Sequence, residues 1–459
     1  MRGFKINRAL LLVLTVIATA IYFPGCMTVS RPHPPLFMPT SPLATSTAED
    51  LAQTGPGHIT ITFWHASTGE EGETLQTLIA EFNAQNENGI IVKAEGYSDY
   101  DYVMKRIVAA IALGSPPDLA IAYGSQIATY AAADAVVPLD GYIANEEWGL
   151  LLPTDIFPVA LEADRFSTFN HEILGFLLDC SLEVMFYNID LLQAAGFEGN
   201  PPQTWEEFAE MCRAVSKGTT SGYTFIPDAS TLISWILSHG GELIDQDGER
   251  PRFNEDPGVE ALTLLADLMD GGQAYQAADF DSMLMSFANG RAAFVTGSTD
   301  NLPAYIEATT DDETGKPRFK WSIAPLPHST AEPVILARGP SLVLFVTTPE
   351  RQLAAWRFVR WLTQKEQATR WALATRRFPI CRSVAEMEEM AAYFEVNPLY
   401  AKAFGFLPYS RAEPAIASWE TVRGILYNAM AEVVSLGKSP RAALNDAAIK
   451  AHAALSEQR

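Results

Sequence analysis

A tyrosine- and aspartate-rich segment at residues 97–102 offers the chemistry of sugar recognition. It holds three tyrosines and two aspartates directly after a predicted strand. Aromatic rings pack on the C–H faces of a pyranose, and carboxylates accept hydrogen bonds from its hydroxyl groups. We therefore predict that Tyr100 and Asp101 bind a sugar-like solute. The same pattern also fits the start of a helix, with Asp99 as its N-cap and Tyr102 packed beneath it.

Polar residues also follow other predicted strands, at positions where a solute is expected. In open parallel sheets, ligands bind beyond the carboxyl ends of the strands. Ser67 follows the strand predicted at 59–64, and Tyr123 and Ser125 lie at the end of the strand predicted at 118–123. We expect these three side chains to lie near the bound solute.

Polar residues interrupt or end two apolar segments downstream. Asp179 and Ser181 lie inside the apolar segment 176–187, which predicts one long strand, and Ser298 follows the strand predicted at 292–296. A polar group in an apolar environment is costly unless it is hydrogen-bonded. Asp179 and Ser181 are therefore expected to face either a bound solute or a network that stabilises a hinge. The small residues around Ser298 suit close approach of a solute.

Alternating strand and helix patterns must position these residues. Apolar–polar alternation predicts the strand at 59–64, and a capping box of Thr68 and Glu71 predicts the helix that follows. The same order resumes after residue 176, before a mostly helical region that begins at Pro349. This order is typical of parallel α/β sheets with helices on both faces. The helix after the first capping box should bury an apolar stripe of Leu75, Leu78, Ile79 and Phe82. Three further helices are predicted: one around 104–111, one that begins at the capping box of Thr204 and Glu207, and one at 257–270. Further strands are predicted at 90–92, 321–324 and 342–346.

The composition excludes several classes of protein. Of 459 residues, 48% are hydrophobic and 19% are charged, which is typical of a folded globular chain. The 55 acidic residues exceed the 32 basic ones and give a net charge of −23, so nucleic acid is not expected as a partner. The sequence has no zinc-ligand spacing, Walker loop or H-E-x-x-H motif, and we predict no metal, no cofactor and no catalytic residue.

The cysteine content is low for a chain of this length. The four cysteines are too few for a disulfide scaffold. Cys212 lies on the apolar stripe of a predicted helix, so we expect a buried free thiol there. A disulfide between Cys180 and Cys381 is an alternative for two of the others.

The N-terminal region has the composition of an export signal. A basic segment precedes an apolar run at 9–23, which is shorter than the about 20 residues of a membrane span. The sequence FPGC at 23–26 resembles the lipobox of bacterial lipoproteins, which implies that residues 1–25 are removed and that Cys26 carries a lipid. A plain signal peptide with an unmodified cysteine is the alternative. The Pro-, Ser- and Thr-rich segment 26–57 predicts an extended tether.

Several short motifs follow one another in a fixed order along the chain. They are ITFWH at 61–65, GEEG at 69–72, GSPPDL at 114–119, YNIDL at 187–191, PQTWEEF at 202–208, GRAAF at 290–294 and WSIAPLP at 321–327. Together they resemble the motifs of family-1 extracellular solute-binding proteins, the substrate-capturing subunits of carbohydrate ABC importers. The similarity extends over about residues 58–455, and its first part is most similar to the glycerol-3-phosphate and glycerophosphodiester binders.

The resemblance implies the periplasmic-binding-protein type II fold, in which two α/β lobes close on a ligand about a hinge. The expected crossing segments lie near 179–183, 294–297 and 339–342. The implied N-terminal lobe comprises residues 58–178 and 298–340, and the C-terminal lobe, with its mostly helical end, comprises residues 179–297 and 341–459.

The resemblance also assigns further residues to the ligand site. It implies a backbone contact at Gly339, beside Arg338, and a cleft position at Arg377. Trp235 and Trp419 lie where relatives offer an aromatic platform, and core packing is an equally open interpretation for Trp235.

Two departures from the glycerophosphate binders bear on the ligand. Gly124 replaces a glutamate of those proteins, and Ala415 falls at the place of their phosphate-binding arginine. Glu70 and Glu71 also oppose an anion at the first turn of a predicted helix. We therefore expect an uncharged monosaccharide or oligosaccharide, with glycerol-3-phosphate or a related polyol phosphate as the alternative.

The implied protein is an exported, lipid-anchored monomer at the cell surface or in the periplasm. It captures a carbohydrate and delivers it to ABC permease subunits, and it is not an enzyme. A secreted glycoside hydrolase is the alternative from another class, because sequence spacing does not reveal the separation of a catalytic carboxylate pair.

Overall fold

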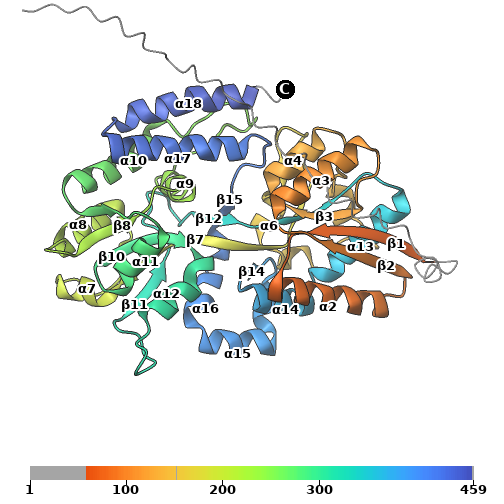
Figure 1. The fold of residues 1–459 in the computed structure, drawn as a ribbon, viewed down its shortest axis with the longest axis horizontal. Helices are drawn as coiled ribbons and strands as arrows, with labels where there is room; N and C mark the ends of the chain where they lie inside the picture. Colours follow the sequence, from red (N-terminus) through yellow and green to blue (C-terminus); the bar gives the residue numbers. More distant parts are fainter. Residues whose placement is uncertain (1–57, 151, 457–459) are drawn as a thin grey trace, which may run out of the picture. The chain divides into compact units, whose positions relative to one another are not determined.

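The computed structural model describes residues 58–150 and 152–456. The predicted signal peptide, the tether at 26–57 and Cys26 lie outside these residues. No described helix is both long and apolar enough to cross a membrane. Figure 1 shows two β-sheets, each flanked by helices, with strand β7 (Asp179–Asn188) running from one toward the other.

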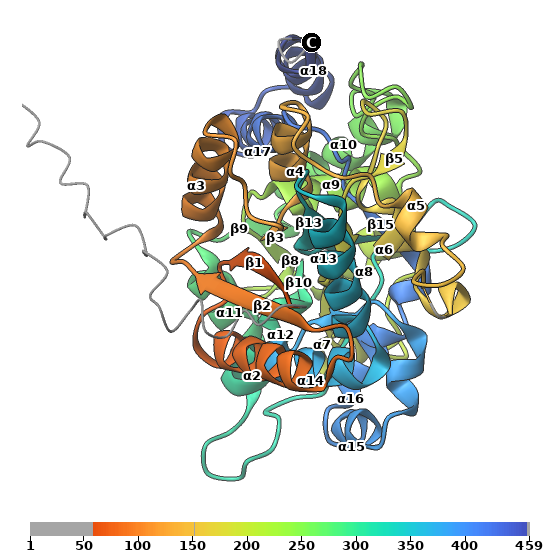
Figure 2. The ribbon, with the colours of Figure 1, turned by 90° about the vertical axis from the view of Figure 1, so that its right-hand side faces the viewer.

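The first sheet has five strands, and its parallel part confirms the predicted α/β order. β1 is parallel to β2 and β3, whereas β13 is antiparallel to both β3 and β6. Helices α2 and α14 pack against each other on one side of this sheet, and α3 and α4 lie on the other side (Figure 2). The strand order is β2 (Ile90–Gly96), β1 (Ile59–His65), β3 (Leu119–Ala122), β13 (Ser341–Leu344) and β6 (Phe176–Leu177), and the helices are α2 (Gly69–Gln85), α3 (Tyr100–Ala112), α4 (Gly124–Ala131), α13 (Pro349–Leu362) and α14 (Lys365–Thr375).

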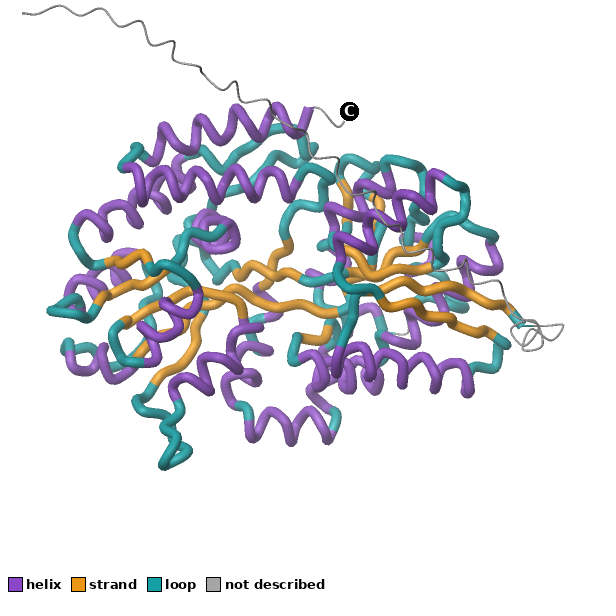
Figure 3. Tube along the Cα trace, in the orientation of Figure 1, coloured by secondary structure: helices purple, strands orange, loops and turns teal. Residues whose placement is uncertain are grey.

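The second sheet has eight strands arranged around β7. Helices cover both of its faces (Figure 3). The strand order is β15 (Ser410–Ala412), β12 (Ile335–Arg338), β7, β10 (Ala292–Ser298), β8 (Ser221–Phe225) and β9 (Ala274–Gln276), and both β11 (Trp321–Ala324) and β14 (Phe378–Pro379) also pair with β7. Its helices are α7 (Ile189–Ala194), α8 (Trp205–Val215), α9 (Ala229–Ser238), α10 (Asp256–Asp270), α11 (Phe280–Ala288), α12 (Leu302–Thr309), α15 (Glu388–Val396), α16 (Pro398–Phe404), α17 (Trp419–Leu436) and α18 (Pro440–Ser456).

Short elements connect these parts. They are α5 (Asp140–Ile143), α6 (Pro158–Glu162), a two-stranded pair of β4 (Arg165–Phe166) and β5 (Glu172–Ile173), and four 3-10 turns at Pro153–Asp155, Thr299–Asn301, Arg382–Glu386 and Leu407–Tyr409.

Apolar periodicity explains why the predicted elements form. In β1, Ile61 and Phe63 are fully buried while Thr60 and Thr62, which alternate with them, are half-buried, as expected for a strand with one face on the core. The predicted stripe of α2 is buried against this sheet. The capping box of Thr204 and Glu207 is confirmed at α8. The one predicted at Thr68 is wrong, because its side chain caps nothing.

The positions at which the chain changes sheets correct several predictions. The predicted long strand at 176–187 is two strands in different sheets, β6 and β7, and the chain returns to the first sheet between β12 and β13. No crossing occurs at 294–297, because β10 and the later β11 both pair with β7. The predicted lobe boundaries are therefore wrong for three strands. β11 and β12 lie within 298–340, which was assigned to the N-terminal lobe, but they belong to the second sheet. β13 lies within 341–459, which was assigned to the C-terminal lobe, but it belongs to the first sheet.

Gly339 lies where two crossing segments approach each other. A Cβ at this position would lie 1.8 Å from the carbonyl oxygen of Asp179. Such a clash could be relieved only if the backbone of one of the two segments moved. Glycine is therefore required by packing of the crossing segments, independently of any ligand.

The three described cysteines are buried free thiols. This confirms the prediction for Cys212, which packs in the core beside α8. The alternative disulfide is wrong, since Cys180 lies opposite Phe378 in the sheet and Cys381 pairs with Ile156.

Candidate functional site

A polar cleft lies where the carboxyl end of β3 meets the strands that cross between the sheets. Two adjoining cavities, of about 50 and 150 Å³, share Tyr123, Arg338 and Gly339, and we call them together the cleft. The cleft is small and polar, with room for several water molecules or a small solute. Its other polar lining residues are Ser125, Asp164, Ser181, Glu183, Ser230, Ser298, Asp300, Ser341, Arg377, Glu413, Trp419 and Glu420.

One wall of the cleft carries the predicted Tyr123, and Tyr100 packs against its ring without lining the cleft itself. The ring centroids of Tyr100 and Tyr123 lie 4.9 Å apart in an edge-on arrangement. Gln126 links their backbones: its side-chain oxygen accepts from the Tyr123 N–H at 3.0 Å, and its side-chain amide donates to the Tyr100 carbonyl at 3.3 Å. Burial raises the pKa of both phenols, so each remains a neutral hydroxyl.

The remaining residues of this predicted cluster form the helix start instead. Asp99 caps α3 by accepting from the Tyr102 N–H at 2.8 Å, which confirms the helix-start interpretation. Tyr102 is exposed rather than packed beneath the helix. Asp101 is also exposed and does not line the cleft.

Ser67 is near the end of β1 but is already engaged. Its side chain is buried, and its hydroxyl donates to the Glu71 carboxylate at 2.6 Å. It is not among the cleft-lining residues. The strand-end rule thus located Tyr123 and Ser125 in the cleft, whereas the chain after β1 turns into α2 outside it.

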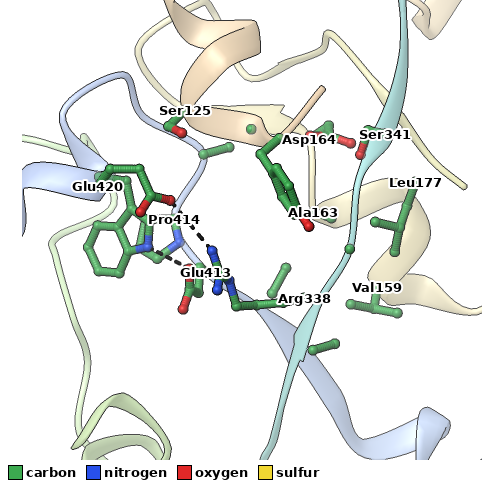
Figure 4. Close-up of a pocket in the computed structure, with 17 residues that line it drawn as sticks. Ser125, Val159, Ala163, Asp164, Leu177, Arg338, Ser341, Glu413, Pro414 and Glu420 are labelled. Carbon is green, nitrogen blue, oxygen red and sulfur yellow. Dashed lines mark hydrogen bonds and ion pairs between the residues drawn. The ribbon is translucent and has the colours of Figure 1, made fainter. Parts of the chain in front are cut away.

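The other wall carries charges in pairs. The Arg338 guanidinium lies 3.4 Å from Glu413 and 3.5 Å from Glu420, and 5.7 Å from the ring centroid of Tyr123. Glu413 also pairs with Arg423 and accepts a hydrogen bond from the Trp419 indole at 2.8 Å. Figure 4 shows Arg338 between the two carboxylates, with Ser125, Asp164 and Ser341 across the cavity. The guanidinium of this β12 residue is therefore held in place by Glu413, in the segment before α17, and by Glu420, in the first turn of α17.

A second network ties β7 to the segment after α14. Asp179 is fully buried, accepts from the Trp371 indole at 2.6 Å, and lies 3.7 Å from the Arg377 guanidinium. Arg377 also lies 3.6 Å from Asp300. Burial raises the pKa of Asp179 to about 7, against the effect of Arg377. Asp179 does not line the cleft, so the hinge-network interpretation fits it, whereas Ser181 and Arg377 do face the cavity.

The two predicted tryptophan platforms differ. Trp235 is 2% exposed and packs in the core against Trp205, Phe208 and Tyr223, so its assignment to the cleft is wrong. The apolar pattern of α9, whose residues are all buried, explains this position. Trp419 does line the cleft, although it is only 3% exposed and also packs in the core.

Several cleft residues were missed from the sequence. Glu183 follows Ser181 by two positions, and strand periodicity alone places both on one face. Glu413 and Glu420 flank the segment around Trp419 that was already expected in the cleft. Asp164 gave no signal, since it follows a short helix outside every predicted strand end; burial raises its pKa to about 7.

Elsewhere in the described part of the chain, the predicted site residues do not gather around another cavity. A larger groove of about 1210 Å³ lies beside α12 and α16, and none of the predicted site residues line it. No group of three or more His, Cys, Asp or Glu side chains in the described chain could hold a metal ion. Aromatic rings, hydroxyls and locked charges suit non-covalent recognition of a small polar solute.

Comparison with known proteins agrees with this architecture. The sugar-binding protein MalE of Xanthomonas citri superposes with a TM-score of 0.75 at 23% identity, covering 87% of this chain and 98% of that chain. UgpB of Mycobacterium tuberculosis, solved in complex with glycerophosphocholine, gives a TM-score of 0.67 at 21% identity, covering 88% of this chain and 100% of that one. These similarities confirm the two-lobed binding-protein fold.

Sequence comparison identifies the family. A binding protein of Brucella abortus is 25% identical over 425 residues, which cover 88% of this chain and 95% of the relative. The sequence profile described as "Bacterial extracellular solute-binding protein" matches residues 77–398, more than half of the chain. The chain therefore belongs to the family of bacterial extracellular solute-binding proteins, which are receptors of ABC transporters.

Proposed function

We propose that this chain captures a carbohydrate in the cleft and delivers it to the permease of an ABC transporter. The observation that carries this proposal is the make-up of the cleft: the ring of Tyr123, backed by Tyr100, lies in one cavity with fixed hydrogen-bonding groups. Aromatic rings pack on sugar C–H faces, and charged acceptors and donors bind hydroxyls. The resemblance to a protein described as sugar-binding supports the same ligand class. The proposed contacts are Tyr100, Tyr123, Ser125, Ser181, Ser298, Arg338, Gly339, Arg377 and Trp419.

The charge balance of the cleft favours an uncharged solute over a phosphate. Arg338 lies between Glu413 and Glu420, and Arg377 lies between Asp179 and Asp300. An anion would have to compete with these carboxylates for each guanidinium, and it would add negative charge to a cavity that already holds an excess of acids. A neutral polyol can use the remaining donors without breaking the pairs.

Capture in such a cleft requires relative movement of the two sheets. A solute that contacts Tyr123 of the first sheet and Ser181 or Ser298 of the second stabilises the closed arrangement only through contacts absent from the open one. The segments that cross between the sheets, at Leu178 and at Gly339, are the expected hinges. The closed receptor is then the form that docks on the permease.

The N-terminal region supports the proposed location. The basic and apolar signal at 1–25, with the lipobox-like end at Cys26, fits export and attachment to a membrane by a lipid. The tether at 26–57 would hold the monomeric receptor near its permease. Mass spectrometry of the mature N-terminus tests this: a diacylated Cys26 supports the anchor, and an unmodified terminus contradicts it.

A thermal-shift screen tests the ligand class. The panel is glucose, maltose, trehalose, glycerol-3-phosphate and glycerophosphocholine, the last because it occupies the mycobacterial relative. A saturable rise in melting temperature with a neutral sugar supports the proposal, and a rise with only the phosphorylated compounds supports the polyol-phosphate alternative. Release of product from an oligosaccharide under the same conditions would instead support a glycoside hydrolase.

A further inference from the structure

We propose that Glu183 contacts the bound solute and makes the cleft selective for an uncharged, hydroxylated solute over an anion. The inference rests on the proposed function, because it assigns a role to a side chain inside the same cleft. Glu183 belongs to none of the motifs that indicated a site.

The strand geometry places Glu183 at the cavity. Side chains of a strand alternate between its two faces, so Glu183 lies on the same face of β7 as Ser181, while Leu182 and Val184 between and beyond them are fully buried in the core. In the antiparallel ladder, Glu183 lies directly opposite Ser298 of β10, and Ser181 lies opposite Arg338 of β12. Directly opposed side chains on one face are neighbours, with Cβ atoms about 5 Å apart.

The Glu183 carboxyl group is buried but has no partner. The residue is 8% exposed and lines the cleft, and within the described residues its side chain makes no hydrogen bond or ion pair. The two neighbouring serines hydrogen-bond to other groups: the Ser181 hydroxyl donates to the Arg338 carbonyl at 3.4 Å, and the Ser298 hydroxyl accepts from the Asp300 N–H at 3.1 Å. The carboxyl oxygens of this nearly buried side chain are accessible only from the cavity, so a solute in the cleft can supply the hydrogen-bond partner that the protein does not.

The charges around Glu183 decide which solute fits. Arg338 of β12 and Arg423 of α17 face it, as do Asp228 before α9 and Glu413 before α17. Both arginines are already paired with Glu413, so neither compensates Glu183 fully. Burial, followed by the charge of Asp228, raises the pKa of Glu183 to about 8.

A carboxyl group in this state matches a hydroxyl. At neutral pH it is mostly protonated, so it both donates and accepts a hydrogen bond, as a sugar hydroxyl does in turn. An anion offers acceptors only, and it meets a repulsive charge whenever Glu183 ionises. Asp164, Asp300, Glu413 and Glu420 line the same cleft and add to this repulsion.

Two substitutions at Glu183 test the inference by titration calorimetry. The probe is the sugar from the panel above that gives the largest wild-type melting shift, with glycerol-3-phosphate as the anionic comparison. E183Q keeps a donor and an acceptor, so we expect sugar affinity within about threefold of wild type, whereas E183L should weaken it at least tenfold. From pH 7 to 9, wild-type affinity should fall as Glu183 ionises, and the affinity of E183Q should fall less, by the part that ionisation of Asp164 causes. E183Q should also bind glycerol-3-phosphate more tightly than wild type does.

The control variant is E73Q, at an exposed position of α2, which should behave as wild type in every titration. Equal sugar affinity for folded E183L and wild type, or an identical pH dependence for E183Q and wild type, overturns the role of Glu183 and leaves the proposed function standing. Failure of every neutral sugar to bind the wild-type protein overturns both. The pH dependence of E183Q decides the question even when E183L fails to fold.

Discussion

The two walls of the cleft differ in how they present chemistry to a solute. The wall from the first sheet offers the ring of Tyr123, which packs against Tyr100 behind it, and one buried carboxyl group, Asp164. The wall from the second sheet offers guanidinium groups, and Arg338 and Arg377 each lie between two carboxylates. The first wall therefore presents mainly an aromatic surface to a solute, and the second presents mainly charged groups that are held in ion pairs.

This difference separates two tasks. Aromatic rings lose little side-chain entropy on binding, and their flat faces determine which solute shapes can pack in the cleft and contribute affinity. Locked ion pairs expose hydrogen-bonding groups while hiding net positive charge, so they decide which charge state is accepted. Substitutions in one wall should therefore change affinity for every sugar, and substitutions in the other should change stability and selectivity.

The largest expected change in stability comes from a substitution that tests whether Trp235 belongs to the core or to the second wall of the cleft. Trp235 lies behind that wall in the core, so Trp235→Ala should lower the free energy of unfolding by about 4 kcal/mol through the cavity it leaves. Sugar affinity of the folded protein should remain within about twofold. Urea unfolding and calorimetry measure the two quantities, and a tenfold loss of affinity would return Trp235 to the binding site.

Breaking the second wall at its hinge should have the next largest effect. Arg377→Met removes the cation beside fully buried Asp179, and we expect the free energy of unfolding at pH 8 to fall by about 3 kcal/mol. The loss should be smaller at pH 6, because Asp179, with a pKa of about 7, takes up a proton there. Arg376→Met, at the exposed neighbouring position, is the matched control. Equal stability of both variants in urea would contradict the network.

Breaking the first wall should affect binding. Tyr123→Ala removes a ring that lines both cavities, and affinity for the bound sugar should fall by about 1.5 kcal/mol, or roughly tenfold. Tyr123→Phe keeps the ring and should retain most of the affinity. The comparison is made by calorimetry, and an unaltered affinity in the alanine variant would remove the aromatic wall from the site.

The smallest expected effect is a pH dependence shared by both walls. Asp164 and Glu183 have pKa values raised by burial to about 7 and about 8, so the folded protein holds protons that the unfolded chain releases. The free energy of unfolding should therefore fall as pH rises from 6.5 to 8, by about 1 kcal/mol for each group. Asp179, with a pKa of about 7, adds to this fall, whereas His239, whose pKa is lowered to about 4, opposes it slightly because the unfolded imidazole loses its proton just above pH 6.5. Urea unfolding at both pH values measures the slope, which E183Q and D164N should each reduce; an unchanged slope in both variants would contradict the assignment.

Much of the fold could be predicted from local pattern. The alternation in β1, the buried stripe of α2 and the capping box of α8 all lie where the sequence indicates them. The sheet to which each later strand belongs could not be predicted in this way. β12 and β13 are both short apolar segments separated by two residues, yet they join different sheets, because Gly339 allows the chain to pass close to the Asp179 carbonyl.

The site was predictable where a strand end or strand periodicity marks it. Tyr123 and Ser125 follow from the end of β3, and Ser181 from a polar interruption of an apolar strand. Trp235 and Trp419 carry equal signals in sequence, and only packing distinguishes a core residue from a cleft residue. Asp164 and Glu413 lie in connecting segments that carry no periodicity.

The sequence by itself determined many of the longer helices and strands, such as β1, α2 and α8, because each depends on the pattern of neighbouring residues, but it did not indicate the break between β6 and β7. It also determined the acidic character that disfavours an anionic partner. Only the tertiary structure decided that Tyr123, Glu183, Arg338 and Glu413 line one cleft. These residues are far apart along the chain, and their meeting depends on which strands pair with β7 and where the chain crosses between sheets, which no local pattern encodes.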